Sequence, residues 1–259
     1  MFEVIDGIEY FCEWSSKMAA KEIGDFIYVQ NEVFDTHIGY SYFKHKFIDN
    51  IYGDSLIVIA YINGAPAAAR AMWRNDLDTG RRQAYQPCDT AVLYKYRGCG
   101  IFKVMTTLAK SRLPHKSILY NFPNKNSYPG YKKLGWRDIG SYCYRIWFGF
   151  RQYEKEHPFL IDSEYVKWWF GSRKDRDFCV VSRKGQHYLM RRRKYNIYIA
   201  IGKICESDAV MFRKTRFPII LFYSQKKSFF HRFSSLIRVV ASGDAPIDIK
   251  IPLYKIDAI

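Results

Sequence analysis

The sequence predicts a mixed α/β protein, because strand and helix patterns alternate along its 259 residues. Residues 56–61 are rich in β-branched side chains, and Asn63-Gly64 is a strong signal for a tight turn before a returning strand over 67–73. A glycine turn at 98–100 then separates an extended run over 83–94 from a segment with helical spacing. These three observations favour a sheet that is covered by helices.

The remaining elements follow from periodicity and turn residues. Residues 15–50 are predicted to be helical in pieces, since apolar and aromatic side chains recur there at helical spacing. The helix that starts at Ile101 should end before Pro114. Further predicted elements are a strand over 117–122, a short helix over 124–134, a strand over 142–150, a helix near 163–170, strands at 178–182, 188–193, 195–201 and 217–223, and an amphipathic helix over 229–240.

The charge of the chain predicts anionic partners. The net charge is +16, and most of the excess lies in residues 151–259, which hold 22 basic and 11 acidic side chains against 19 and 14 in residues 1–150. Such a field attracts phosphorylated small molecules, an acidic membrane face or nucleic acid. The run Arg191–Lys194 has two interpretations, a phosphate or nucleic-acid contact and a solvated strand end.

Cysteine usage and hydropathy suggest a cytoplasmic protein. The six cysteines are irregularly spaced with no CxxC pair, so neither a zinc module nor a disulfide framework is expected. No signal-peptide pattern begins at Met1, and no apolar run approaches the ~18 residues that a transmembrane helix needs. We therefore expect no metal site and no transmembrane segment.

The glycine turn before Ile101 is a candidate anion site. Glycines let backbone N–H groups approach a ligand closely, and the helix N-terminus adds about half a positive charge. The P-loop pattern is absent, and Lys103 stands where a dinucleotide fingerprint needs its third glycine. From these residues alone, a phosphate site and a plain strand-to-helix turn both remain open.

Residues 91–102 resemble the pyrophosphate motif R/Q-x-x-G-x-G/A of the GNAT (GCN5-related N-acetyltransferase) superfamily. Arg97 and Gly100 fill its first two fixed places, and Phe102 departs from the last. Asn124, Ser127 and Tyr131, followed by Lys133-Leu134-Gly135-Trp136, resemble the family's N-x-x-A-x-x-x-Y-x-K-x-G-F run. Two motifs in the family's order are more specific than either alone, and the resemblance covers roughly residues 50–150.

The resemblance implies a GNAT fold and a cofactor, acetyl-CoA or another acyl-CoA. An amine would attack the thioester directly in a ternary complex, Tyr131 would protonate the departing thiolate, and Asn124 would bind the pantetheine or order its loop. A backbone N–H near Val92 would polarise the thioester oxygen. The implied cofactor-binding residues are Ala91, Val92, Arg97, Gly98, Cys99, Gly100, Ile101, Phe102 and Asn124.

A general base is harder to predict. Asp89, on the strand that leads into the glycine turn, is the first candidate, and its alternative is a strand-end carboxylate. His37 and His45 are weaker candidates, and water could serve because desolvation lowers the pKa of an amine. An acyl-enzyme on Cys99 is disfavoured, since no histidine stands beside it in sequence.

We expect two domains, an acyl-CoA-binding GNAT domain over 1–150 and a C-terminal α/β domain over 151–259. The second resembles the degenerate half of larger two-part GNAT proteins, which packs on the first to form the acceptor site. The expected function is N-acyl transfer to a small anionic amine, such as a nucleotide-linked amino sugar. The alternatives are an amine on a peptide or RNA, and a protein that binds CoA or nucleic acid without turnover, which the bulk of Phe102 would favour.

Overall fold

The computed structural model describes residues 2–77, 82–147, 159–173, 177–193, 197–215, 219–224, 237–242, 244–246 and 251–255. It confirms the mixed α/β class. The chain forms two compact units, one of Met1–Arg137 with Val240–Ile247 and one of Asp138–Val239 with Asp248–Ile259. The division into domains at residue 150 stays a prediction, whereas these compact units change over at Arg137 and return a C-terminal piece to the first unit.

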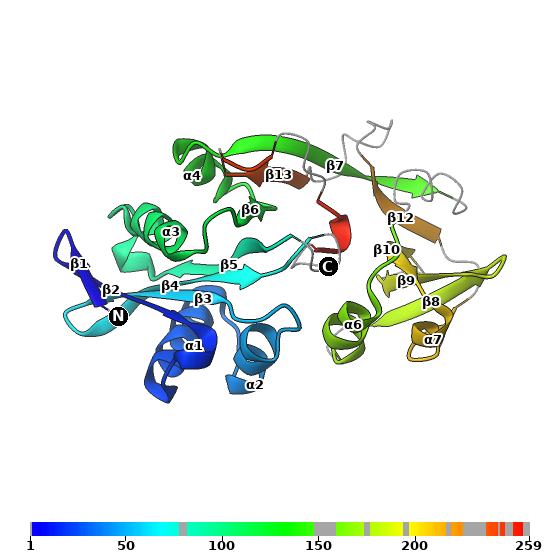
Figure 1. Cartoon of the computed structure of the whole chain (residues 1–259), viewed down its shortest axis with the longest axis horizontal. Coiled ribbons are helices and arrows are strands. Elements are labelled where there is room, and N and C mark those ends of the chain that lie inside the picture. Colours follow the sequence, from blue (N-terminus) through cyan, green and yellow to red (C-terminus); the bar gives the residue numbers. More distant parts are fainter. Residues whose placement is uncertain are drawn as a thin grey trace. The chain divides into compact units, whose positions relative to one another are not determined.

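The sheet of the first unit is antiparallel in its first five strands (Figure 1). These are β1 (Phe2–Ile5), β2 (Ile8–Trp14), β3 (Leu56–Ile62), β4 (Ala65–Arg74) and β5 (Ala84–Val92). The predicted hairpin is confirmed: Asn63 and Gly64 both have positive φ, as the two-residue turn between β3 and β4 requires. Strands β1 and β2 were not predicted.

Two further strands extend this sheet. β6 (Ile118–Asn121) pairs parallel with β5, and the end of β13 (Ile237–Ala241) pairs antiparallel with β6 through Val240 and Ala241. The amphipathic helix predicted over 229–240 is wrong at its C-terminal end, where the chain is extended, and residues 229–236 lie outside the described part. The last three residues of β13 are all buried, so the chain here does not show the helical period that the apolar residues suggested.

Helices cover both faces of this sheet. α1 (Ala20–Phe34) and α2 (Tyr40–Phe43), which continues into a π-helical turn over Lys44–Ile48, lie on one face, and α3 (Ile101–Arg112) lies on the other (Figure 1). Four alanines of β4 are fully buried, Ala67, Ala68, Ala69 and Ala71, and α1 packs against this strand. The shorter elements of this unit are the 3₁₀ turns Ser15–Lys17 and Tyr94–Tyr96 and the helix α4 (Tyr128–Lys133).

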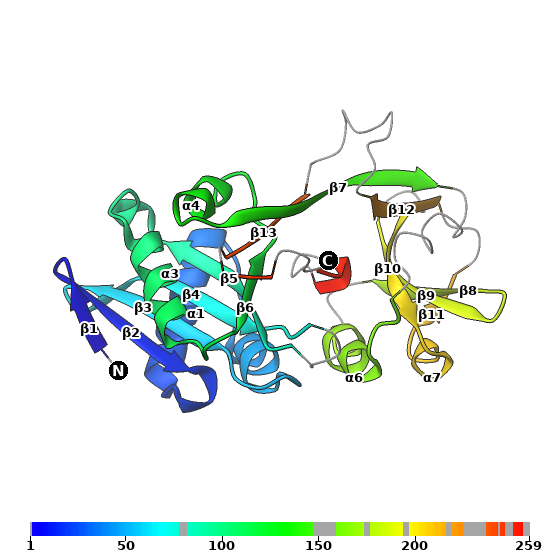
Figure 2. The ribbon, with the colours of Figure 1, turned by 45° about the horizontal axis from the view of Figure 1, so that its top comes forward.

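The second unit has its own mixed sheet (Figure 2). Its strands in spatial order are β7 (Arg137–Trp147), β12 (Ile219–Ser224), β10 (Ile197–Ile204), β9 (Gln186–Arg192), β8 (Phe178–Arg183) and β11 (Arg213–Lys214). The β10–β12 and β8–β11 pairs are parallel, and the others are antiparallel. The helical elements are α6 (Ser163–Tyr165), which continues into a π-helical turn over Val166–Gly171, α7 (Glu206–Ala209) and a 3₁₀ turn at Leu253–Lys255.

Each predicted strand of this half has an observed counterpart in the described ranges, although residues 148–150, 195–196 and 217–218 of those predictions lie outside them. Within those same ranges, no helix has the length and apolar character needed to cross a membrane.

Candidate functional site

Strand β5 leaves regular pairing just before the glycine turn. It pairs with β6 only through Ala84 and Tyr85, so its second half is paired with β4 alone among the described strands. Its register with β4 shifts by one residue, and Asp89 and Thr90 together oppose Arg70. Asp89 has a φ of 43°, which marks a local β-bulge. Bulges of this kind re-aim backbone groups, and they are frequent beside active sites.

The glycine turn forms a set of unpaired donors at the start of α3. Gly98 and Gly100 have φ of 85° and 75°, a conformation that glycine adopts without steric cost. None of the five backbone amides from Gly98 to Phe102 donates to a protein acceptor within the described ranges. Because α3 has 12 residues, its N-terminal partial charge adds to these donors. We call residues 98–102 the amide cradle; its geometry suits a phosphate.

Arg97 stands beside the amide cradle and is exposed. Its Nε donates to the Val92 carbonyl at 3.1 Å, and its guanidinium carbon lies 5.4 Å from the centre of the Tyr94 ring. These contacts hold the cation near the turn while its terminal nitrogens make no protein hydrogen bond in the described structure. The Cys99 thiol is exposed, 3.9 Å from the Arg97 carbonyl oxygen.

Phe102 is packed into the first unit. Its ring centre lies 5.5 Å from that of Tyr131, edge to face, and 4.6 Å from the guanidinium carbon of Arg70. A methyl group added at Gly130 would lie 2.8 Å from a ring carbon of Phe102. The bulk at this motif position is therefore accommodated by the missing side chain at residue 130.

Tyr131 is buried on α4, with 1% of its surface exposed. Its hydroxyl oxygen accepts hydrogen bonds from Nη2 of Arg70 at 2.5 Å and from Nδ2 of Asn121 at 2.7 Å. Burial raises the pKa of Tyr131, and the Arg70 cation and the Asn121 hydrogen bond oppose that rise. The Tyr131 side chain is thus kept as a neutral phenol. The Arg70 cation lies beside the oxygen that would carry the negative charge after ionisation.

Arg70 has no carboxylate partner among the described residues. It is fully buried on β4, and besides Tyr131 it donates to Oγ1 of Thr106 at 2.5 Å. Burial lowers the pKa of Arg70, and Tyr131 opposes that change. Sequence reasoning missed Arg70, Thr106 and Asn121. The one available signal was a single arginine among the small apolar residues 67–71.

Asp89 is held by a buried cation. Its carboxylate accepts from Nζ of Lys46 at 3.1 and 3.2 Å and from the Tyr42 hydroxyl at 2.9 Å. Its backbone carbonyl accepts from Nε2 of Gln30 at 2.6 Å. Lys46 is 1% exposed, with the Trp73 ring centre 5.2 Å from its ammonium nitrogen. These contacts fix the bulge, and the role of Asp89 as a base stays a prediction.

The other predicted residues occupy separate places. Oδ1 of Asn124 accepts from the amides of Asn126 and Ser127 at 3.0 and 2.9 Å, so it orders the turn that leads into α4. Ala91 is buried on β5, where Ala91 and Val92 oppose residues 69 and 68 of β4. His37 is exposed after α1, and His45 lies in the π-helical turn.

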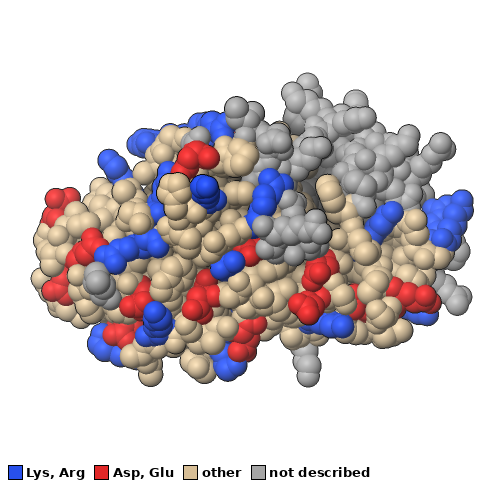
Figure 3. All heavy atoms as spheres, in the orientation of Figure 1, with Lys and Arg blue, Asp and Glu red and all other residues tan. Residues whose placement is uncertain are grey.

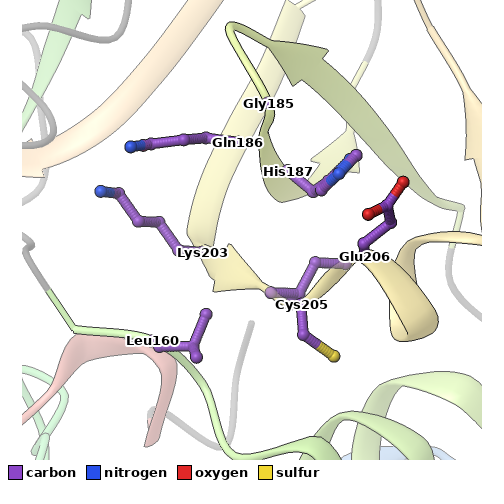
Figure 4. Close-up of a pocket in the computed structure, with 8 residues that line it drawn as sticks. Leu160, Gly185, Gln186, His187, Lys203, Cys205 and Glu206 are labelled. Atoms are coloured by element: carbon purple, nitrogen blue, oxygen red, sulfur yellow. The ribbon is translucent and has the colours of Figure 1, made fainter.

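A pocket of about 270 Å³ lies in the second unit (Figure 4). The thiol of Cys205 donates to Asp208 at 2.9 Å, and Nδ1 of His187 lies 2.8 Å from Oγ of Ser182. The described ranges contain no cluster of His, Cys, Asp or Glu fit for a metal ion. The lining residues are Leu160, Gly185, Gln186, His187, Lys203, Ile204, Cys205 and Glu206.

On the face that Figure 3 shows, the charge of the described residues does not single out a nucleic-acid site. Lys and Arg are interspersed with Asp and Glu over the described atoms in the view of Figure 3. In the basic run, Arg192 lies 3.5 Å from the Asp177 carboxylate, and Lys194 lies outside the described ranges.

The pairing of β5 with β6 over two residues, the bulge in β5 and the glycine turn before α3 characterise this α/β unit, and solved structures match the chain. A GCN5-related N-acetyltransferase from Kribbella flavida aligns with a TM-score of 0.56 at 10% identity, over 90% of this chain and 71% of its own. One from Anabaena variabilis aligns with a TM-score of 0.53 at 13% identity, over 90% and 72%. No family model and no curated protein matches the sequence. The chain has the GNAT fold, which confirms the resemblance at the level of fold.

Proposed function

We propose that the chain is an acyl-CoA-dependent N-acyltransferase. The observation that carries this proposal is the amide cradle, which places five unpaired N–H donors and the Arg97 cation at the N-terminus of α3. The pyrophosphate of CoA is a ligand that such donors suit. Acyl-CoA, when bound, would supply an acyl group activated as a thioester.

The chain's own residues have three roles in this proposal. The amide cradle and Arg97 bind the diphosphate, and the β5 backbone near Val92 aligns the reacting carbonyl. Tyr131 donates its proton to the leaving sulfur, because both lone pairs of its oxygen are already engaged by Arg70 and Asn121. The proton that the attacking amine loses passes either to Asp89 or to water.

The acceptor is proposed to be a small anionic amine, such as a nucleotide-linked amino sugar. Support comes from the charge of +16 and its concentration in residues 151–259. A peptide or RNA amine is the competing acceptor. A thiol-release assay over nucleotide-linked amino sugars, polyamines, peptides and RNA decides between them, and steeply salt-dependent RNA binding would favour the RNA amine.

The cofactor site is tested by calorimetric titration with CoA. Gly100→Val places a side chain in the amide cradle, and Gly64→Val is its matched control, since both glycines have positive φ and open space around an added Cβ. We expect Gly100→Val to weaken CoA binding at least tenfold and Gly64→Val to leave it unchanged. Equal affinity in both variants, or no CoA binding by the unsubstituted protein, would refute the proposal.

A further inference from the structure

The buried guanidinium of Arg70 is unusual because its charge has no carboxylate partner among the described residues. A buried cation costs several kcal/mol of free energy unless a partner compensates it. Arg70 has only neutral partners: the hydroxyls of Thr106 and Tyr131 and the ring of Phe102. Its Nε has no hydrogen-bond partner in the described structure.

The Tyr131 hydroxyl, one of the groups that Arg70 contacts, has a distinctive hydrogen-bond arrangement. A phenol oxygen has two lone pairs and one proton, and here Arg70 and Asn121 engage both lone pairs. The proton is therefore the only part of the group left to interact with a ligand, and no acceptor for it occurs in the described ranges. Its direction is set by the two donors that hold the oxygen.

We propose that Arg70 is a positioning residue that aims the Tyr131 proton into the site and stabilises the negative charge left on the oxygen once that proton has gone. This inference rests on the proposed function. As the new C–N bond forms and the C–S bond breaks, the Tyr131 O–H bond breaks and its proton passes to sulfur. The phenolate then recovers a proton released from the amine through solvent.

The surroundings of Arg70 favour this role over a purely structural one. The titratable groups that face it are Tyr131 from α4 and Cys88 from β5, while α3 contributes Thr106 and Phe102, which do not titrate in this range. A structural prop for Phe102 would need only an apolar side chain of similar length. A negative charge that forms nearby would compensate this cation, and the Tyr131 oxygen, which is within hydrogen-bond distance, is where it would form.

The test places 3-fluorotyrosine at residue 131 and follows its ionisation by ¹⁹F NMR, without CoA. Arg70→Gln should raise the titration midpoint by about one pH unit or more, since the cation is lost, and Arg70→Lys should raise it less. Arg74→Gln is the control on the same strand, where Arg74 pairs with Asp76, and it should leave the midpoint unchanged. An unchanged midpoint in folded Arg70→Gln overturns the proposal. If that variant does not fold, an unchanged titration and kcat in Arg70→Lys overturn it.

Kinetics separate this inference from the proposed function. Arg70→Gln should lower kcat while CoA affinity stays within threefold. Adding Arg70→Gln to Tyr131→Phe should cause no loss beyond that of Tyr131→Phe alone, because Arg70 acts through the Tyr131 proton. A full additive loss in the double variant would contradict the inference alone. Failure of the unsubstituted protein to bind CoA would contradict the proposed function, whereas the ¹⁹F titration would still report on Arg70.

Discussion

The ring of Phe102 lies so close to Gly130 that a methyl group there would approach a ring carbon to 2.8 Å. The contact joins the glycine turn to α4, since Phe102 is the second residue of α3 and Gly130 precedes Tyr131. Residue 102 corresponds to the motif position where the GNAT pattern has glycine or alanine, and here it is a phenylalanine. Its ring fits because the facing residue on α4, Gly130, has no side chain.

Gly130→Ala should destabilise the protein by about 1–3 kcal/mol, as overpacking does. In the Phe102→Ala background the same change should stabilise by up to ~1 kcal/mol, because alanine is the better helix former once the clash is gone. Denaturant unfolding of the four proteins measures the sign reversal. Additive free energies would show that the two residues do not compete for space.

Lys46→Met should cost about 3 kcal/mol of stability, because it leaves the Asp89 carboxylate without its buried cation. If Asp89 only anchors the bulge, Asp89→Asn and Lys46→Met should lower kcat by similar factors without a change in the pH profile. If Asp89 is the base, Asp89→Asn alone should remove the acidic limb of the profile. Unfolding curves and pH-rate profiles of both variants distinguish the two roles.

Tyr131→Phe should lower kcat by about a hundredfold and leave CoA affinity within threefold, as expected on loss of a general acid. It also leaves donors of Arg70 and Asn121 without their acceptor, so stability should fall by about 1–3 kcal/mol. Tyr120→Phe is the control, since Tyr120 is equally buried on β6 and its hydroxyl donates to the Asn75 carbonyl. Unchanged turnover in Tyr131→Phe would remove it as the acid.

Alkylation at pH 8 should modify Cys99 well before the buried thiols. Burial raises the pKa of Cys12 to about 12 and that of Cys179 to about 11, so both thiols stay protonated at that pH and react slowly. Because Cys99 belongs to the amide cradle, saturating CoA should slow its modification at least tenfold. Peptide mass spectrometry measures both rates, and no protection of Cys99 would argue against CoA in the cradle.

Local signals made the hairpin and the glycine turn predictable. The conformations of Asn63, Gly64, Gly98 and Gly100 depend on residue type and close neighbours, which a sequence displays directly. Arg70 could not be assigned in this way, because its partner Tyr131 is 61 residues further along and the contact depends on how α4 packs. The same holds for Lys46 and Asp89, which are 43 residues apart.

Long-range pairing also explains the error at β13. The apolar spacing over 229–240 suits a helix locally, and pairing with strands that are distant in sequence selects the extended form over 237–241. No residue near β13 in sequence indicates those partners.

The pairing of Val240 and Ala241 with β6 has a consequence for biosynthesis. A ribosome makes β6 more than a hundred residues before it makes the strand that covers its edge. During that interval the nascent chain presents an uncovered strand edge, a template on which chains associate. A polypeptide that stops at residue 150 would keep this edge permanently, so this fragment should self-associate where the chain of 259 residues does not.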